Sequence, residues 1–298
     1  MKKLVCIINP IAGKGNGRTI ADIVRKNLDS TVYDFSIRFT EYGGHAGEIA
    51  AEAASQGADI VVAVGGDGTV NEVASRLSGT RTALAIIPRG SGNGLANHLG
   101  LPKNIRENLA LINKGSAACI DTACVNGHPF FCTCGVGYDA KVAMDYAKAG
   151  TRGLITYVRK TLEAWHSYTP GTYRITTDSA DFEVKAFLIT VGNANQWGNN
   201  YHITPKASLQ DGLLDITIIH PFNLLQAAPI PIQLLDSRIY HNSKVDALRA
   251  GSVRIERIDR LTEGSAAQQE AHFDGEAFMT GPVLDISITP ANLNVIVP

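Results

Sequence analysis

The feature that most constrains this chain is a glycine-rich turn between an apolar run and a helix pattern. Residues 60–64, Ile-Val-Val-Ala-Val, predict a strand of a parallel sheet that is covered on both faces. Apolar residues in 70–77 recur at the spacing of one helix face. The three glycines of 65–68 let the backbone approach a ligand, and the first N–H groups of the helix favour an anion. The segment therefore predicts a phosphate site, in which Asp67 suggests a magnesium-nucleotide complex.

Two further loops have the same character. Residues 9–17 follow an apolar strand at 4–8, and residues 88–94 follow another at 84–87. One such turn is as often structural as functional, but the carboxyl ends of parallel strands line a common crevice. The three loops together therefore predict one nucleotide site. Neither a Walker A sequence nor a complete Rossmann fingerprint is present, since Arg18 stands where the third glycine would be.

The order of the expected elements divides the chain near residue 122. Before it, strands and helices alternate, which predicts a doubly wound α/β domain over 1–122. Its strands are expected at 4–8, 32–39, 60–64 and 84–87, and its helices at 18–28, 44–56, 70–77, 95–99 and 104–113. After it, strands dominate, which predicts a β-rich domain over 123–289. Its strands are expected at 121–125, 130–134, 173–177, 182–191, 213–219, 253–258 and 283–288, with helices at 139–148 and 152–166.

Composition agrees with a two-domain enzyme and excludes some other classes. A net charge of −1 and the lack of a basic stripe argue against a nucleic-acid binder. The five cysteines are odd in number and lie mostly in apolar segments, which indicates reduced residues of a cytoplasmic protein. Cys132 and Cys134 lack the spacing of a metal site. We find no signal peptide and no apolar run long enough to span a bilayer.

Four segments form a set. They are Asn9-Pro10 with its glycines, Gly65-Gly66-Asp67-Gly68-Thr69 with Asn71-Glu72, Pro88-x-Gly90-Ser91-Gly92-Asn93, and Phe273-Asp274-Gly275-Glu276. This set resembles the diacylglycerol kinase catalytic family, which includes sphingosine and ceramide kinases and bacterial lipid kinases, and the resemblance covers essentially the whole chain. The second segment is shared with NAD kinases and phosphofructokinase relatives, whereas the last two narrow the resemblance to lipid kinases. Gly94 departs from the diacylglycerol-specific pattern, which has Asp there, and looks more like the sphingosine-kinase version.

The resemblance implies a fold and an activity. The fold is an N-terminal doubly wound α/β nucleotide-binding domain and a C-terminal β-sandwich-like lipid-substrate domain, with the active site in the cleft between them. It also suggests that residues from about 290 to 298 return to the first domain. The activity is transfer of the γ-phosphoryl group of ATP to a lipid hydroxyl with Mg²⁺, and both diacylglycerol-like and sphingoid-like acceptors remain open.

The resemblance also implies roles for individual residues of this chain. Asp274 is the expected base, with Glu276 close to the nucleotide and Asp67 as a third acid. Without the resemblance, Asp274-Gly275 reads more readily as a hairpin turn. The expected nucleotide contacts are Asn9, Pro10, Ile11, Ala12, Gly13, Thr40, Gly65, Gly66, Asp67, Gly68, Thr69, Val70, Asn71, Glu72, Gly90, Ser91, Gly92 and Asn93. Lys14 and Arg18 could touch phosphate or simply be solvated, and His45 reads as a surface or capping residue.

The segment 208–215 resembles a metal-holding element of the family. By that resemblance Asp211 is the expected Mg²⁺ ligand, together with the carbonyl oxygens of Ser208 and Leu213, although a turn before a strand explains the same residues. Asp121 matches another family acid but could equally cap a strand.

Membrane contact is expected from the substrate class rather than from a clear motif. The apolar segment 221–235 and the side chains of Trp165 and Trp197 could meet an interface, but core packing is the favoured explanation. The expected partners are a lipid substrate, the inner face of the membrane in transient peripheral contact, and a second copy in a possible homodimer. Two alternatives stay open: an NAD-kinase-like enzyme, and a catalytically silent lipid-binding protein, against which the presence of Asp67, Asp274 and Glu276 argues.

Overall fold

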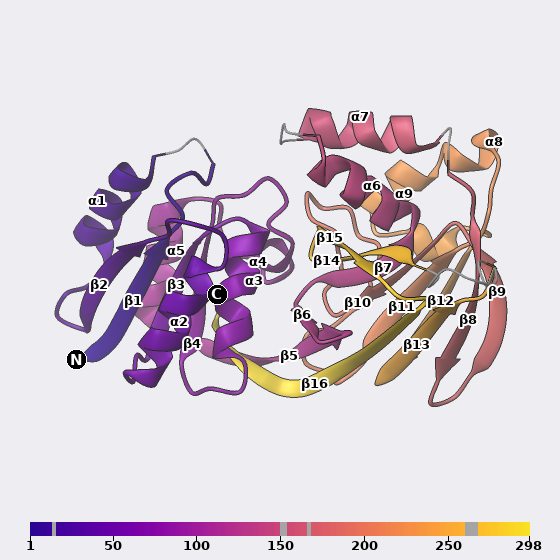
Figure 1. Cartoon of the computed structure of the whole chain (residues 1–298). Helices are drawn as coiled ribbons and strands as arrows, with labels where there is room; N and C mark the ends of the chain where they lie inside the picture. The colour runs from indigo at the N-terminus through magenta and orange to yellow at the C-terminus, as the bar shows by residue number, and fades with distance from the viewer. Residues whose placement is uncertain (14–15, 150–153, 166–167, 260–267) are drawn as a thin grey trace. The chain divides into compact units, whose positions relative to one another are not determined.

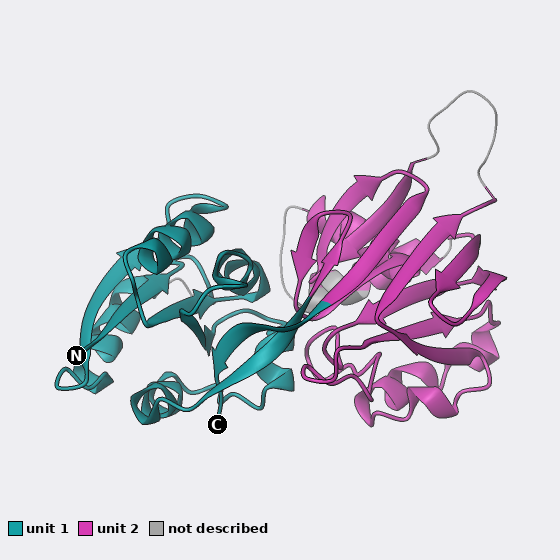
Figure 2. Ribbon diagram, turned by 90° about the horizontal axis from the view of Figure 1, so that it is seen from below, with its two compact units in different colours: residues 1–122, 289–298 teal, residues 123–288 magenta. Residues whose placement is uncertain are grey.

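The computed structural model describes residues 1–13, 16–149, 154–165, 168–259 and 268–298 (Figure 1). The chain divides into two compact units, coloured separately in Figure 2. Unit 1 comprises residues 1–122 and 289–298, and unit 2 comprises residues 123–288.

Unit 1 contains a parallel sheet with helices on both faces. Its parallel strands run in the order β2, β1, β3, β4, with bounds β1 Lys2–Ile8, β2 Tyr33–Phe39, β3 Ile60–Gly65 and β4 Ala83–Pro88. Every residue of β3 and β4 is buried, as their apolar runs predict. The helices are α1 Gly17–Asn27, α2 His45–Ser55, α3 Asp67–Leu77, α4 Gly94–His98 and α5 Ile105–Lys114. The expected doubly wound domain is confirmed.

The two faces of that sheet are covered by different helices. Ile20 of α1 and Leu109 of α5 belong to one buried cluster with Val62 and Ile87 of the strands. Helices α2 and α3 contact each other and the strands as well. In this parallel sheet the loops that lead from strands to helices lie at the carboxyl ends of the strands. The expected phosphate loops occur at that edge.

Unit 2 is a sandwich of mainly antiparallel strands. One sheet has six strands in the order β12, β11, β10, β7, β14, β15, and the other contains the antiparallel run β16, β13, β8, β9. The bounds are β5 Ala117–Val125, β6 His128–Phe130, β7 Thr133–Gly137, β8 Gly171–Thr177, β9 Asp181–Ala186, β10 Leu188–Gly192, β11 Leu214–Ile219, β12 Val245–Ala250, β13 Ser252–Arg257, β14 Gln269–Phe273, β15 Glu276–Thr280 and β16 Val283–Ile296. One buried cluster contains Val136 and Ile216 from the first sheet and Tyr173 and Ile255 from the second. The expected β-sandwich is confirmed.

The helices of unit 2 gather around aromatic side chains. They are α6 Tyr138–Ala147, α7 Leu154–Trp165, α8 Leu224–Ala227, α9 Ile230–Leu235 and the short 3₁₀ helix η1 Ile239–His241. The ring of Trp165 contacts those of Phe187 and Phe222 in tilted arrangements, and Trp197 packs against the same cluster. Both tryptophans are partly buried against this cluster, which agrees with core packing, and their contact with a membrane interface stays a prediction.

Several elements differ from the sequence prediction. The strand expected at 182–191 is interrupted at Phe187, and its halves β9 and β10 join different sheets. Strand β16 runs to Ile296, beyond the expected end at 288: Leu284 pairs with Ile255 of β13, and Val295 pairs with Leu84 of β4. Residues 152–153 and 166 of the helix expected at 152–166 lie outside the described residues. No helix within the described ranges is long and apolar enough to cross a membrane.

Candidate active site

Backbone and side-chain hydrogen bonds join the three glycine-rich loops of unit 1. Asn9, after β1, donates its Nδ2 to Oγ1 of Thr69 in the first turn of α3, at 3.2 Å. Arg89, after β4, donates its backbone N–H to the carbonyl of Gly65 at 2.7 Å. Thr40, at the end of β2, donates its N–H to the carbonyl of Ile8 at 3.0 Å. The expected phosphate loops thus lie at the same edge of one sheet.

Asp67 holds the second and third loops together. Its Oδ2 accepts the backbone N–H of Asn93 at 2.8 Å, and its Oδ1 accepts that of Gly94 at 2.7 Å. Burial raises the pKa of Asp67 above its ordinary value, and the two amide donors oppose that rise. The carboxylate that the sequence assigned to a magnesium-nucleotide complex therefore also closes two loops of its own chain.

The glycines of these loops allow backbone to pass close to backbone. A Cβ on Gly90 would lie 2.6 Å from Cα of Gly66 and 2.9 Å from Oδ1 of Asn93. A Cβ on Gly92 would lie 2.8 Å from Oδ2 of Asp67. Asn93 fixes the same loop, since its Oδ1 accepts the N–H of Gly90 at 2.8 Å and its Nδ2 donates to the Gly90 carbonyl at 2.7 Å. These contacts explain physically why the loops require glycine.

The loop after β1 makes a tight turn around Asn9. Its Oδ1 accepts the N–H of Ile11 at 3.1 Å, and its carbonyl accepts the N–H of Ala12 at 3.2 Å. Gly13 has a φ of +67°, and a Cβ there would lie 3.1 Å from the Arg89 carbonyl and 3.4 Å from its guanidinium. Lys14 lies outside the described residues.

Arg89 is a candidate that the sequence analysis missed. It occupies the unspecified position of the Pro-x-Gly motif, so the motif itself drew no attention to its side chain. Its Nε is buried and has no hydrogen-bond partner among the described residues. A guanidinium beside Gly13, at the edge of the loops, has the charge and the donor geometry that suit phosphate.

Some expected nucleotide contacts have structural partners. Glu72 accepts the N–H groups of Gly44 and Ala46 at 2.8 and 3.1 Å, and so caps the start of α2 from α3. Asn71 accepts the hydroxyl of Ser75 at 3.3 Å. His45, at the start of α2, accepts the N–H of Glu41 on its Nδ1 at 3.1 Å. A contact between Glu72 or Asn71 and a nucleotide stays a prediction.

Asp274 occupies the turn of the β14–β15 hairpin in unit 2. Asp274 and Gly275 have φ values of +47° and +83°, as a two-residue hairpin turn requires. Its carboxylate folds back onto the start of β7 and accepts three successive backbone N–H groups, from Phe131 at 2.9 Å, Cys132 at 2.7 Å and Thr133 at 3.2 Å. The hairpin-turn interpretation therefore describes the local backbone, while three amides orient the carboxylate.

The same hairpin carries a buried histidine, His272 of β14, which pairs with a buried acid of α6, Asp139. His272 of β14 lies with its Nε2 at 3.0 Å from Oδ2 of Asp139, and Thr190 donates its hydroxyl to that oxygen at 2.7 Å. All three side chains are buried, and Nδ1 of His272 has no partner among the described residues. No sequence motif points to any of the three. Glu276 begins β15 and is exposed.

The two acids of the segment expected to hold Mg²⁺ pair with an arginine of β12. Arg249 donates to Oδ2 of Asp211 and, through its Nε at 3.2 Å, to Asp215. Asp211 also accepts the N–H of Leu213 at 3.1 Å, as in an Asx turn. Among the described side chains no group of three His, Cys, Asp or Glu could hold a metal. This pairing leaves the loop a poor fit for a divalent ion, and the metal role of Ser208, Asp211 and Leu213 stays a prediction.

Asp121 has a structural partner at the end of the chain. Its Oδ1 accepts the N–H of Ala291 at 2.8 Å, and the neighbouring Thr122 accepts Nδ2 of Asn292 at 2.9 Å on its hydroxyl. Both contacts lie within unit 1. Asp121 thus helps to hold the returning tail.

Comparison with known proteins places these motifs in a family. The model of the diacylglycerol kinase catalytic domain matches residues 3–125, and that of the YegS C-terminal NAD kinase beta sandwich-like domain matches residues 132–297. The chain belongs to the diacylglycerol kinase family. As a member of this lipid kinase family, the chain is a kinase.

Individual relatives of this lipid kinase family match over most of their length. The diacylglycerol kinase of Bacillus subtilis (strain 168) is 29% identical over 266 residues, which are 88% of this chain and 88% of that protein. A protein of Cronobacter sakazakii named "Probable lipid kinase YegS-like" is 31% identical over 209 residues, covering 68% of this chain and 70% of that protein. A crystal structure of a diacylglycerol kinase from Bacillus anthracis str. Sterne matches with a TM-score of 0.73 at 25% identity, covering 100% of this chain and 97% of that one.

Proposed function

We propose that this chain transfers the γ-phosphoryl group of MgATP to the hydroxyl of a membrane lipid. The observation that carries the proposal is the joining of three glycine-rich loops in unit 1 by Asn9, Asp67 and Arg89. Such an edge of backbone amides is suited to polyphosphate. The acceptor class is supported by the names of the relatives, which specify diacylglycerol and lipid.

Unit 1 supplies the donor side of the reaction. Helix α3 begins at Asp67, directly after Gly65 and Gly66. The free N–H groups at its amino end favour an anion. The guanidinium of Arg89 contributes positive charge, which phosphoryl transfer needs where the transferred group develops negative charge. Mg²⁺ arrives with the nucleotide as part of the substrate, so no resident metal is required.

Unit 2 supplies the acceptor side. The lipid hydroxyl oxygen forms a bond to the γ-phosphorus, the bond between that phosphorus and the β–γ bridging oxygen breaks, and ADP leaves. The hydroxyl proton passes to the carboxylate of Asp274, which three amides orient. Glu276, two residues along the same hairpin, is proposed to lie near the nucleotide.

One residue, Gly94, bears on which lipid is the acceptor. Gly94 stands where a diacylglycerol-specific kinase has Asp, and here its N–H is donated to Asp67. Diacylglycerol-like and sphingoid-like acceptors are therefore both offered in the test.

The test is transfer of labelled γ-phosphate from MgATP to mixed micelles of diacylglycerol, monoacylglycerol, sphingosine, ceramide or undecaprenol, with NAD as a separate acceptor. We expect a phosphorylated lipid from wild type. Asp274→Asn should lower kcat by about 10²- to 10⁴-fold, the usual contribution of a general base. Asn tolerates a positive φ, so the turn should persist. Asp178→Asn, the same substitution at an exposed position of unit 2, is the matched control.

Three outcomes contradict the proposal in different ways. Phosphate on NAD alone would replace the lipid acceptor with a dinucleotide. Full activity in Asp274→Asn would remove Asp274 from proton transfer while leaving the reaction intact. Failure of folded wild-type protein to label any acceptor would favour a silent lipid-binding protein.

A further inference from the structure

Helices α8 and α9 carry a cluster of exposed aliphatic side chains. Leu224 and Leu225 of α8 are 75% and 87% exposed, and Ile232 and Leu235 of α9 are 63% and 49% exposed. These are four of the eleven large hydrophobic side chains that are exposed in the described part of the chain, and they fall within twelve residues. Such clustering marks an interaction surface, whereas scattered exposed hydrophobics are ordinary. We call these four side chains the α8–α9 patch.

The opposite side of the same segment is firmly anchored. Leu234 is buried in the aromatic cluster of unit 2, and Phe222 and Ile230 pack against it. Helix α8 begins with a capping box, in which the Asn223 side chain accepts the N–H of Gln226 at 3.0 Å and the Gln226 side chain accepts that of Asn223 at 3.1 Å. The outward direction of the patch is therefore fixed by packing and capping.

The segment that carries the patch contains no charge. From Pro221 to Leu235 there is no Asp, Glu, Lys, Arg or His. Ionisable side chains resume on both flanks as hydrogen-bonded pairs: Arg238 donates its Nε to Asp236 at 2.8 Å, and Nε2 of His220 lies 2.6 Å from Oδ2 of Asp246. An uncharged apolar centre with a paired polar rim is complementary to the uncharged boundary between lipid headgroups and acyl chains.

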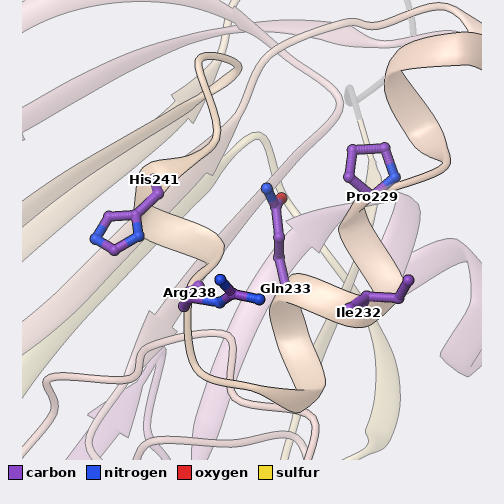
Figure 3. A pocket seen from close by; sticks show the side chains of 5 residues that line it. All are labelled: Pro229, Ile232, Gln233, Arg238 and His241. Atoms are coloured by element: carbon purple, nitrogen blue, oxygen red, sulfur yellow. The ribbon is translucent and has the colours of Figure 1, made fainter.

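A small cavity opens beside the patch. It has a volume of about 230 Å³ and is lined by Pro229, Ile232, Gln233, Arg238 and His241 (Figure 3). Its apolar lining comes from Pro229 and Ile232 of the α9 region, whereas Arg238 and His241 supply a guanidinium and an imidazole. A single lipid molecule likewise has an apolar acyl chain next to a polar headgroup.

We propose that the α8–α9 patch is the surface through which this protein inserts into a lipid bilayer. This inference rests on the proposed function, because an enzyme with a lipid acceptor must reach the membrane. Binding to the bilayer itself requires no catalysis. A second protein is a poorer occupant. Helices of four and six residues are far smaller than the roughly 20–30 residues that each side of a standard protein interface contributes.

The test is co-sedimentation of the full chain with phosphatidylcholine vesicles, alone and with added phosphatidylglycerol. We expect binding to both, with weak salt dependence, because the flanking charges are paired. The double variant Leu225→Ser with Ile232→Ser should bind at least tenfold more weakly, since it removes two insertable aliphatic side chains. Leu162→Ser, at a 66% exposed leucine of α7, is the matched control and should bind like wild type.

Each contrary result has a distinct meaning. Unchanged vesicle binding in the folded double variant overturns the inference, as does binding confined to anionic vesicles. If sedimentation velocity shows a dimer of wild type that the double variant abolishes, while vesicle binding is equal, the patch is an interface between two copies. Asp274→Asn should bind vesicles like wild type, so loss of phosphoryl transfer and loss of membrane binding are separable.

Discussion

Asp67 shows how one carboxylate can set the pH response of a site. Burial raises its pKa, and the amides of Asn93 and Gly94 oppose that rise without reversing it. A carboxyl group with a higher pKa in the folded chain binds an extra proton on folding between the two pKa values. Its stabilising contribution is therefore fully present below the unfolded value of about 3.9 and is lost as the pH rises through the folded pKa.

This sign gives a prediction for Asp67→Asn. The variant should be less stable at every pH by about 1–3 kcal/mol, because an amide offers an acceptor oxygen to only one of the two N–H donors. The free-energy difference between wild type and variant should shrink as the pH rises from about 4, and then level off. Urea unfolding of both proteins across that range is the measurement, with Asp34→Asn at an exposed position of β2 as control. A difference that widens with pH would show that the shift has the opposite sign.

Residues were predictable from the sequence where their signal is local. Asp67 and Asp274 each stand beside glycine in a turn, and both turns occur where expected. The buried group of Asp139, Thr190 and His272 carries no such signal, because only the pairing of β7 with β10 and β14 brings it together. Assigning it from the sequence would have required knowing the sheet order.

At the scale of elements, the close approach of the β3 and β4 loops is the feature most exposed to mutation. We predict that Gly90→Ala raises the KM for ATP at least tenfold, because its Cβ would lie 2.6 Å from Cα of Gly66 and force the two loops apart. Steady-state kinetics at saturating lipid measures the effect, and thermal unfolding reports whether the fold survives.

The matched control for this substitution is Gly43→Ala. Gly43 also lies in a loop of unit 1, but nothing lies within 4 Å of a Cβ built there, and it has no positive φ. Its KM for ATP should equal that of wild type. An equal KM in Gly90→Ala would mean that the approach of the loops does not shape the nucleotide site.

Fully buried strands were easier to predict from the sequence than partly exposed ones. Strands β3 and β4 were found almost to the residue because they are buried throughout. Strands β12 and β15 were missed, since their partly exposed, mixed residues show no clear alternation. The segment 221–235 was expected to pack mainly in the core, yet it divides its apolar residues between the core and the outside. Composition alone cannot distinguish these two faces.

At the scale of the whole molecule, the chain enters unit 2 at residue 123 and returns to unit 1 at residue 289. The strand expected at 283–288 ends before this return, because Pro290 and the polar residues after it interrupt the apolar pattern. The return depends on pairing with β4, about 200 residues earlier in the chain. No local pattern could predict such a partner, and only the family resemblance suggested it.

The returning tail should be essential for unit 1 and dispensable for unit 2. Leu293, Val295 and Ile296 are almost completely buried in unit 1. Each is worth about 1.5–3 kcal/mol of burial, and their sum is comparable with the 5–15 kcal/mol that stabilise a typical domain. Deletion of residues 289–298 should therefore abolish hydrogen-exchange protection across residues 1–122.

The two tryptophans make the outcome specific to each unit. Both lie in unit 2, so native tryptophan fluorescence should persist in the truncated chain while MgATP binding is lost. Deletion of Pro298 alone, which is exposed, is the control and should change neither signal. Retained protection in residues 1–122 of the truncated chain would show that the first 122 residues fold alone. In that case the ten returning residues would only supplement a sheet that is already stable.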